Sequence, residues 1–215
     1  GQKAKIQNSY RVAVPGCYAS GFISIARPLV ELGLVPQSYP FSCTGISGYS
    51  GGGKKMIAEY EGERVNTALN APRPYGLALH HKHLPEMTAV TGLDPAPNFV
   101  PIVADYYAGM ETMIPLDLPA LGLTAQQVAD ALADYYAGQK MISVHPLNEG
   151  TDGGFLAANK LAGLDRLEIF CLANPDGTQM ELISLFDNLG KGSSGAAVQC
   201  MNLMLGLDET AGLAL

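Results

Sequence analysis

The fold class is decided by residues 167–186, which read LEIFCLANPDGTQMELISLF. Two apolar runs, 167–173 and 180–186, flank Asn-Pro-Asp-Gly-Thr, a cluster of turn-forming residues, and this pattern predicts a β-hairpin. Further strands are predicted at Phe41–Ile46, Phe99–Val103, Met110–Leu118 and Met141–His145. Strands outnumber helices in the second half, and two neighbouring strands form a hairpin. We therefore expect an α+β fold with a mixed, largely antiparallel sheet.

Three helices are predicted around these strands. The first opens at Cys17 and ends at Gly33, and Pro28 within it should bend the helix or loosen a turn. The second, Thr124–Tyr136, starts with a Thr-x-x-Gln capping box, and the third runs from about Ser193 to Gly206. A short strand is expected at 11–14, mostly irregular backbone over 65–101, and a loop or lid over 148–163. No Gly-x-Gly-x-x-Gly joins a first strand to a helix, so we expect no self-contained dinucleotide domain.

The composition is that of a folded domain and disfavours several classes of protein. The 215 residues (22.6 kDa) are 47% hydrophobic and 15% charged, which is enough apolar material for a sizeable core. A net charge of −7, with no run of Lys or Arg, disfavours a nucleic-acid binder. No apolar run is long enough to span a membrane. The four cysteines are dispersed without a Cys-x-x-Cys pair, which indicates reduced thiols in a cytoplasmic protein and no zinc site.

Cys17 is the candidate nucleophile. It follows Pro15-Gly16 and opens the first predicted helix, where unpaired backbone N–H groups and the helix dipole favour a thiolate. Most free cysteines are instead small buried hydrophobic residues, and position alone leaves the two interpretations about equal. The other three cysteines fall within predicted strands or a helix and are expected to pack in the interior.

A histidine cluster, His80-His81-Lys82-His83-Leu84-Pro85-Glu86, is the candidate acid–base group. Imidazole titrates near neutrality and can both accept and return a proton. A solvated polar loop is the alternative, and a distant histidine pairs with a cysteine only if the fold brings them together. Tyr75 could donate a hydrogen bond to an oxyanion or carboxylate, or could simply pack.

The loop from Ser47 to Lys55, SGYSGGGKK, is a candidate anion-binding loop. Its glycines expose backbone N–H groups, its serines can donate hydrogen bonds and its lysines add positive charge. The spacing does not match a Walker A loop, and a flexible surface loop is about equally consistent with it.

Taken together, four stretches resemble the N-acetyl-γ-glutamyl-phosphate reductases of arginine biosynthesis, in their shorter bacterial branch. They are Val14-Pro15-Gly16-Cys17-Tyr18, residues 47–54 (SGYSGGGK), residues 81–87 (HKHLPEM) and residues 187–199 (DNLGKGSSGAAVQ), the last continuing to Leu207. Val14 stands where the family usually has asparagine, and Ala19-Ser20 replace a common Pro-Thr. Neither difference removes a reacting group, although Val14 lacks an amide that usually helps to position the turn.

The resemblance implies the fold of the glyceraldehyde-3-phosphate and aspartate-semialdehyde dehydrogenase-like reductases, whose helices cover one face of the catalytic sheet. It implies a catalytic (dimerisation) domain at 1–186 and a C-terminal segment and helix at 187–215. That helix would return to an N-terminal Rossmann domain, about a hundred residues that this chain lacks. A homodimer or homotetramer is expected, and the chain alone should be inactive without its cofactor domain.

The resemblance also implies an NADP(H)-dependent reaction through a cysteine thioester. Cys17 would be the nucleophile and His81 the acid–base histidine, with His83, Tyr75 and Glu86 orienting the substrate or the base. The nicotinamide half of the cofactor would contact the glycine loop and a residue near the C-terminus, namely Ser47, Gly48, Ser50, Gly51, Gly52 and Asn188. Two lysines, Lys54 and Lys82, would bind the phosphate of the substrate.

Two alternatives stay open. One is a related acyl-phosphate reductase, of the aspartate-semialdehyde or a lysine-pathway type, although the former does not share the His-Lys-His-Leu-Pro-Glu string. The other is a docking and assembly module without turnover of its own.

Overall fold

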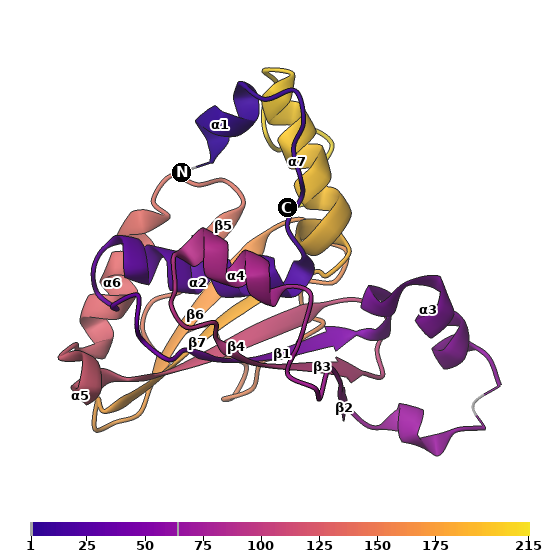
Figure 1. The fold of residues 1–215 in the computed structure, drawn as a ribbon, viewed down its shortest axis with the longest axis horizontal. Coiled ribbons are helices and arrows are strands. Elements are labelled where there is room, and N and C mark those ends of the chain that lie inside the picture. Colours follow the sequence, from indigo (N-terminus) through magenta and orange to yellow (C-terminus); the bar gives the residue numbers. More distant parts are fainter. Residues whose placement is uncertain (1, 64) are drawn as a thin grey trace.

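One mixed sheet organises the part of the chain that the structure describes, residues 2–63 and 65–215 of a computed structural model. Its seven strands lie in the order β2-β3-β1-β4-β7-β6-β5 (Figure 1). Their bounds are β1 Ser42–Gly48, β2 Arg73–Pro74, β3 Asn98–Ala104, β4 Met110–Asp117, β5 Ile142–Val144, β6 Leu167–Ala173 and β7 Gln179–Phe186. The pairs β1–β3 and β5–β6 are parallel and the other pairs are antiparallel. The expected α+β fold with a largely antiparallel sheet is confirmed.

The predicted hairpin is the antiparallel pair β6–β7, in which Phe170 lies opposite Ile183. Its turn is held by Asn174, whose side-chain oxygen accepts hydrogen bonds from the backbone N–H groups of Thr178 (2.9 Å) and Gln179 (3.0 Å). Asparagine therefore replaces a missing backbone partner at the turn, as its short polar side chain does in many loops.

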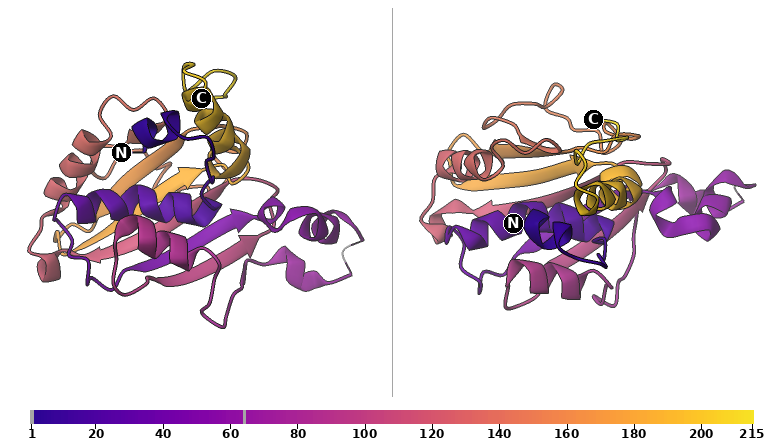
Figure 2. Two further views of the ribbon diagram at one scale, coloured as in Figure 1. Left: turned by 45° about the horizontal axis from the view of Figure 1, so that its top comes forward. Right: turned by 90° about the horizontal axis from the view of Figure 1, so that it is seen from above.

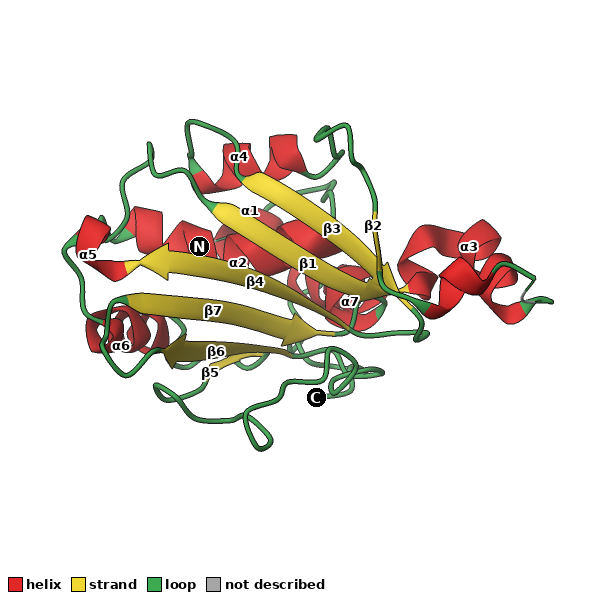
Figure 3. Cartoon of the chain, turned by 90° about the horizontal axis from the view of Figure 1, so that it is seen from below, coloured by secondary structure: helices red, strands yellow, loops and turns green. Residues whose placement is uncertain are grey.

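The helices lie on one face of the sheet or beyond its ends. They are α1 Lys3–Gln7, α2 Cys17–Glu31, α3 Gly53–Glu61, α4 Leu84–Thr91, α5 Leu118–Leu121, α6 Ala125–Tyr135 and α7 Gly195–Met204, with short 3₁₀ turns η1 Tyr49–Gly52 and η2 Thr67–Asn70 and a π-helical turn η3 Gly190–Ser194. Figure 3 shows the opposite face of β1, β3, β4 and β7 without a helix in front of it. Helix α1 lies beside α7 (Figure 2), and Lys3 of α1 forms an ion pair at 2.6 Å with Glu209, which follows α7 in the chain. No helix of the described residues is long and apolar enough to cross a membrane.

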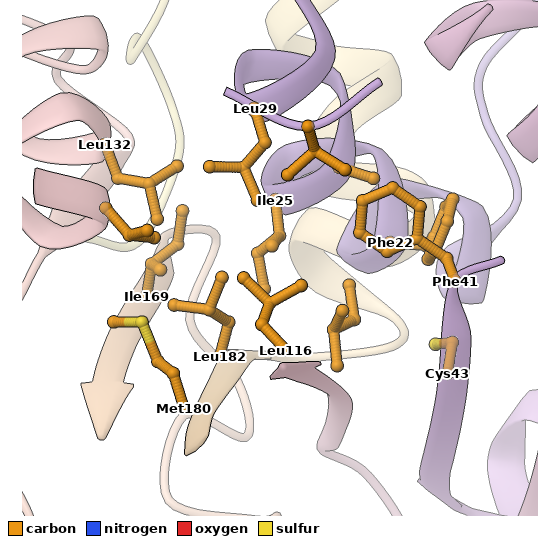
Figure 4. Close-up of a cluster of buried hydrophobic side chains, with 14 of the residues drawn as sticks. Phe22, Ile25, Leu29, Phe41, Cys43, Leu116, Leu132, Ile169, Met180 and Leu182 are labelled. Carbon is orange, nitrogen blue, oxygen red and sulfur yellow. The ribbon is translucent and has the colours of Figure 1, made fainter. Parts of the chain in front are cut away.

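The main core lies between α2, α6 and the sheet. Phe22, Ile25 and Leu29 recur at helical spacing on α2 and are fully buried, which places one face of the helix on the strands (Figure 4). They meet strand residues such as Leu116 and Leu182. Each such side chain contributes roughly 1.5–3 kcal/mol through removal of its apolar surface from water. This packing fixes the direction of α2 and hence the position of its first residue, Cys17.

Pro28 does not end α2, which continues to Glu31. A proline inside a helix cannot donate to the carbonyl four residues before it, here that of Ser24. The hydroxyl of Tyr136 donates to this carbonyl at 2.6 Å. The end of α6 therefore supplies the hydrogen bond that Pro28 cannot, and α2 and α6 are tied together.

Two local predictions differ from the structure. Residues 11–14 form no strand, because no strand of the described residues pairs with this run. The region 65–101 contains helix α4, which begins at Leu84, directly after His83, with Pro85 in its first turn and Gly92 at its end. Both are ordinary helix-boundary residues. The last helix begins with η3 at Gly190, before the predicted start at Ser193.

Candidate active site

Cys17 is the first residue of α2, as its sequence position predicts. Its side chain is half-buried, and the preceding Gly16 is the N-cap residue in an extended conformation (φ −68°, ψ 150°). The thiol meets the backbone N–H groups of Cys17 and Tyr18, both of which lower its pKa. The start of a helix thus presents free N–H groups to the sulfur.

The turn before Cys17 is held from α4. The backbone N–H of Gly16 donates to Oε2 of Glu86 at 3.1 Å. The imidazole of His83 lies directly against Gly16: a methyl group at Gly16 would lie 2.5 Å from Cδ2 of His83 and closer still to Nε2. Because no side chain fits between them, only glycine at this position lets the histidine approach the turn of the cysteine.

Helix α7 and its π-helical start reach the same place from the other end of the chain. A methyl group at Gly192, in η3, would lie 3.0 Å from Cβ of Cys17 and 3.0 Å from the backbone oxygen of Asp187. The π-turn therefore packs its backbone against the cysteine, and π-helical turns are frequent at functional sites.

A cavity of about 460 Å³ joins these elements. The residues that line it come from the start of α2, the glycine loop, the histidine cluster and the segment before α7, and they include Cys17, Ser47, Gly48, Ser50, Gly51, Gly52, Tyr75, His81, Lys82, His83 and Asn188. The four stretches that carry the family resemblance, widely separated in sequence, therefore border one hollow.

Both histidines of the cavity favour the neutral form. Burial lowers the pKa of His83 to about 4, with the neighbouring His81 and Lys82 adding to the effect. Burial and the Lys82 charge also lower the pKa of His81. Nδ1 of His81 accepts a hydrogen bond from the backbone N–H of His83 at 3.2 Å, so the neutral His81 ring carries its proton on Nε2. Nδ1 of His83 is buried and has no hydrogen-bond partner among residues 2–63 and 65–215.

The pKa of Cys17 is raised, contrary to the thiolate expected at a helix start. Burial of the sulfur is the largest cause and the Glu86 charge adds to it, while the backbone N–H groups and the Lys82 charge act in the opposite direction. The free-energy cost of removing a thiolate from water exceeds the stabilisation that the N–H groups at the helix start give it. The sulfur is therefore protonated at neutral pH, and its activation requires a base.

Asn188 ties the glycine loop to the sheet. Its Nδ2 donates to the hydroxyl of Ser50 at 2.9 Å, and its Oδ1 accepts from the backbone N–H of Gly109 at 2.8 Å. The side chain is buried, whereas Gly51 and Gly52 are exposed at the edge of the cavity. Because Gly51 and Gly52 have no side chains and the loop is held in place by Asn188, a flat cofactor ring could lie against their backbone.

Two predicted residues are not among the described residues that line the cavity. Lys54 lies in the first turn of α3 with an exposed side chain, and Glu86 lies behind the Gly16 turn. Other lining residues were not predicted as site residues, among them Tyr18, Met56 and Ser193. The ring of Tyr18 lies 6.0 Å from that of His81 and 6.1 Å from that of His83, and its hydroxyl donates to the backbone oxygen of Ile102 at 2.9 Å. Its place next to Cys17 was the available signal.

No group of three or more His, Cys, Asp or Glu in residues 2–63 and 65–215 could hold a metal ion. All four cysteines are free thiols.

Comparison with solved structures bears on the fold. An aspartate semialdehyde dehydrogenase II from Vibrio cholerae superposes with a TM-score of 0.66 over 95% of this chain and 65% of its own, at 17% identity. A probable aspartate-semialdehyde dehydrogenase from Pseudomonas aeruginosa gives a TM-score of 0.65 over 94% of this chain and 66% of its own, also at 17% identity. The sheet and its helices therefore have a semialdehyde-dehydrogenase-like fold.

Comparison of sequences gives the family. The family model for the semialdehyde dehydrogenase dimerisation domain matches residues 17–188. The N-acetyl-gamma-glutamyl-phosphate reductase of Sinorhizobium medicae is 44% identical over 207 residues, which cover 95% of this chain and 67% of that protein. The N-acetyl-gamma-glutamyl-phosphate reductase 2 of a Nostoc species is 40% identical over 222 residues, 99% of this chain and 69% of that protein. The chain, which spans about two thirds of the length of these relatives, belongs to the N-acetyl-gamma-glutamyl-phosphate reductase family.

Proposed function

We propose that this chain is the catalytic part of an enzyme that reduces N-acetyl-γ-glutamyl phosphate to N-acetylglutamate γ-semialdehyde, with NADPH as reductant and release of phosphate, in arginine biosynthesis. The observation that carries the proposal is the single cavity shared by Cys17, His81, His83 and the glycine loop. The substrate follows from the relatives at 40–45% identity, which are N-acetyl-gamma-glutamyl-phosphate reductases.

The first half of the reaction forms a thioester. Neutral His83, beside the Gly16 turn, accepts the thiol proton of Cys17 as the sulfur attacks the acyl carbon, because Nδ1 of His81 already accepts the His83 N–H and its Nε2 carries the proton. A carbon–sulfur bond forms, and the bond from carbon to the phosphate oxygen breaks, so that phosphate leaves with the electron pair. The Nε2 proton of His81 is available to the oxygen that becomes negative. The low pKa of both rings keeps them neutral at neutral pH, which leaves His83 able to accept a proton and His81 able to donate its Nε2 proton.

The second half releases the aldehyde. When bound, NADPH would supply the hydride that reduces the thioester carbon. The carbon–sulfur bond then breaks with its electron pair passing to sulfur, the semialdehyde leaves, and the thiolate of Cys17 takes back its proton from the protonated imidazole of His83. Ser47, Gly48, Ser50, Gly51, Gly52 and Asn188 are the proposed residues on the nicotinamide side.

The remaining side chains fit substrate binding. Lys82 lines the cavity and is exposed, so its ammonium can attract the phosphate of the substrate. Lys54 is not among the cavity-lining residues and could attract the phosphate only from outside the cavity. Tyr75 is 37% exposed with its ring 5.8 Å from that of His81, a position from which its hydroxyl can donate to substrate.

The proposed assembly is a homodimer or homotetramer in the cytoplasm. The match to a dimerisation domain supports self-association. The helix-free face of the sheet carries half-buried apolar side chains suited to a second copy, among them Ile46, Val100, Ile102 and Met113.

The test is the replacement Cys17→Ser in the longer enzyme, measured as phosphate-dependent reduction of NADP⁺ by the semialdehyde. We expect loss of activity below detection, with Cys43→Ser, at a buried site outside the cavity lining, as the matched control. A Cys17→Ser enzyme with normal turnover would refute the mechanism.

A further inference from the structure

The N-cap amide of α2 has an unusual partner. A helix start leaves its N-cap N–H without an intrahelical acceptor, and in a capping box a Glu or Gln three residues later reaches back to it. Helix α6 of this chain has such a box, with Thr124 and Gln127. In α2 the residue three positions after the N-cap is Ala19, whose side chain has no hydrogen-bond acceptor. Glu86, which is 70 residues distant and belongs to α4, accepts from the Gly16 N–H instead.

The same glycine carries the contact with His83. Glu86 lies in the first turn of α4, and His83 is the N-cap residue of that helix. The two side chains are therefore joined by one rigid turn, and both reach Gly16, one at its N–H and the other at its Cα. The hydrogen bond of Glu86 thus sets the distance between His83 and the turn that bears Cys17.

Glu86 itself lies away from the reactants. It is not among the described residues lining the cavity of Cys17, but borders a separate groove beside Ser20 and Arg27. A carboxylate on this side of the turn cannot reach an acyl phosphate in the cavity.

We propose that Glu86 is a positioning residue, which caps α2 from α4 and thereby holds His83 against the Cys17 turn. The resemblance gave Glu86 a role in orienting the substrate or the base; its position behind the Gly16 turn assigns it the orientation of His83 and no contact with substrate or proton transfer of its own. The catalytic consequence rests on the function proposed above, whereas the capping role does not.

The charge of Glu86 works against the thiolate. The charged groups that act on the sulfur are Lys82, which lowers the thiol pKa, and Glu86, which raises it. If the carboxylate serves as a hydrogen-bond acceptor, then glutamine, which keeps a carbonyl oxygen and loses the charge, should replace it.

The experiment compares Glu86→Gln with Glu86→Ala, and takes Glu59→Gln on the exposed side of α3 as the control. Three readouts are followed: exchange of the Gly16 amide by NMR, alkylation of Cys17 by iodoacetamide against pH with the modified peptide identified by mass, and kcat and KM in the longer enzyme. The first two need only this chain and no substrate, so they stand even if the proposed reaction is wrong.

For Glu86→Gln we expect Gly16 protection and kcat within about threefold of the parent and a lower pH midpoint of alkylation. For Glu86→Ala we expect Gly16 protection to fall at least about tenfold and kcat on the order of a hundredfold at unchanged KM, as for a misplaced catalytic group. Equal loss of kcat in both variants would show that the carboxylate itself transfers a proton and would overturn the proposal. Parent-like protection of Gly16 in Glu86→Ala would overturn it as well.

Discussion

Replacing Gly16 by alanine would place a methyl group where the ring of His83 lies. The added carbon would be 2.5 Å from Cδ2 of that ring, and carbon atoms in contact are ordinarily about 3.5–4.0 Å apart. The imidazole must therefore recede by about 1 Å or rotate into the cavity. The backbone of Gly16 (φ −68°, ψ 150°) is equally accessible to alanine, so the main chain itself is not strained.

Activity and stability should respond differently. A displacement of about 1 Å in a reacting group can lower the rate by roughly a hundredfold. Stability should change by less than about 2 kcal/mol, because the cost of overpacking is partly offset by the lower entropy of the unfolded alanine chain. Since burial holds the pKa of His83 at about 4, a displaced and more hydrated ring should titrate closer to 6.5.

The assay combines kcat, urea denaturation and an NMR titration of His83, with His83→Ala as the reference background. In that background Gly16→Ala should cause little further loss, because the ring it displaces is already absent. A Gly16→Ala enzyme with unchanged kcat and an unchanged His83 titration would refute the account of this contact.

Two further predictions concern stability. Burial raises the pKa of Glu181 from 4.5 to about 7, so the folded chain binds the carboxyl proton more tightly than the unfolded chain does. The stability contributed by this protonated carboxyl group is therefore complete below pH 4.5 and is lost as the pH rises through 7. Glu181→Gln should therefore be more stable than the parent at pH 8, by about 1–2 kcal/mol because solvent screens this partly exposed carboxylate, and little different at pH 4.5 in urea denaturation; a difference independent of pH would contradict this. Asn188→Ala should lower the free energy of unfolding by about 2–4 kcal/mol, because the N–H of Gly109 and the hydroxyl of Ser50 lose their shared partner, and a loss below about 0.5 kcal/mol would count against that tie.

The elements that the sequence predicts well are those with local causes. The hairpin at 167–186 has its turn residues between two apolar runs, α6 has its own capping box, and α2 shows a helical apolar face. The order of the strands has no local cause: β1 lies between β3 and β4 through contacts distant in sequence. The supposed strand at 11–14 failed for the same reason, since an apolar run becomes a strand only if a neighbour accepts its hydrogen bonds.

In the candidate site, too, the features with local causes could be predicted from the sequence, and those that depend on packing could not. Residue types and the family resemblance indicated most of the residues that line the cavity, because the reactivity of a thiol such as Cys17 or an imidazole such as His81 is known from the residue type alone. Burial decides the rest and is not visible in a sequence: it raises the thiol pKa that the helix start alone would lower. The place of Glu86 behind the turn likewise depends on how α4 packs beside α2.

The most direct test of the central claim is the mass of the chain after incubation with N-acetyl-γ-glutamyl phosphate and no NADPH. If the sulfur of Cys17 displaces phosphate, one N-acetylglutamyl group should be bound per chain, mapped to the peptide of Cys17, released by hydroxylamine as a thioester and absent from Cys17→Ser. An intact chain without an adduct, although the phosphate compound binds, or an adduct on any other residue would contradict the account.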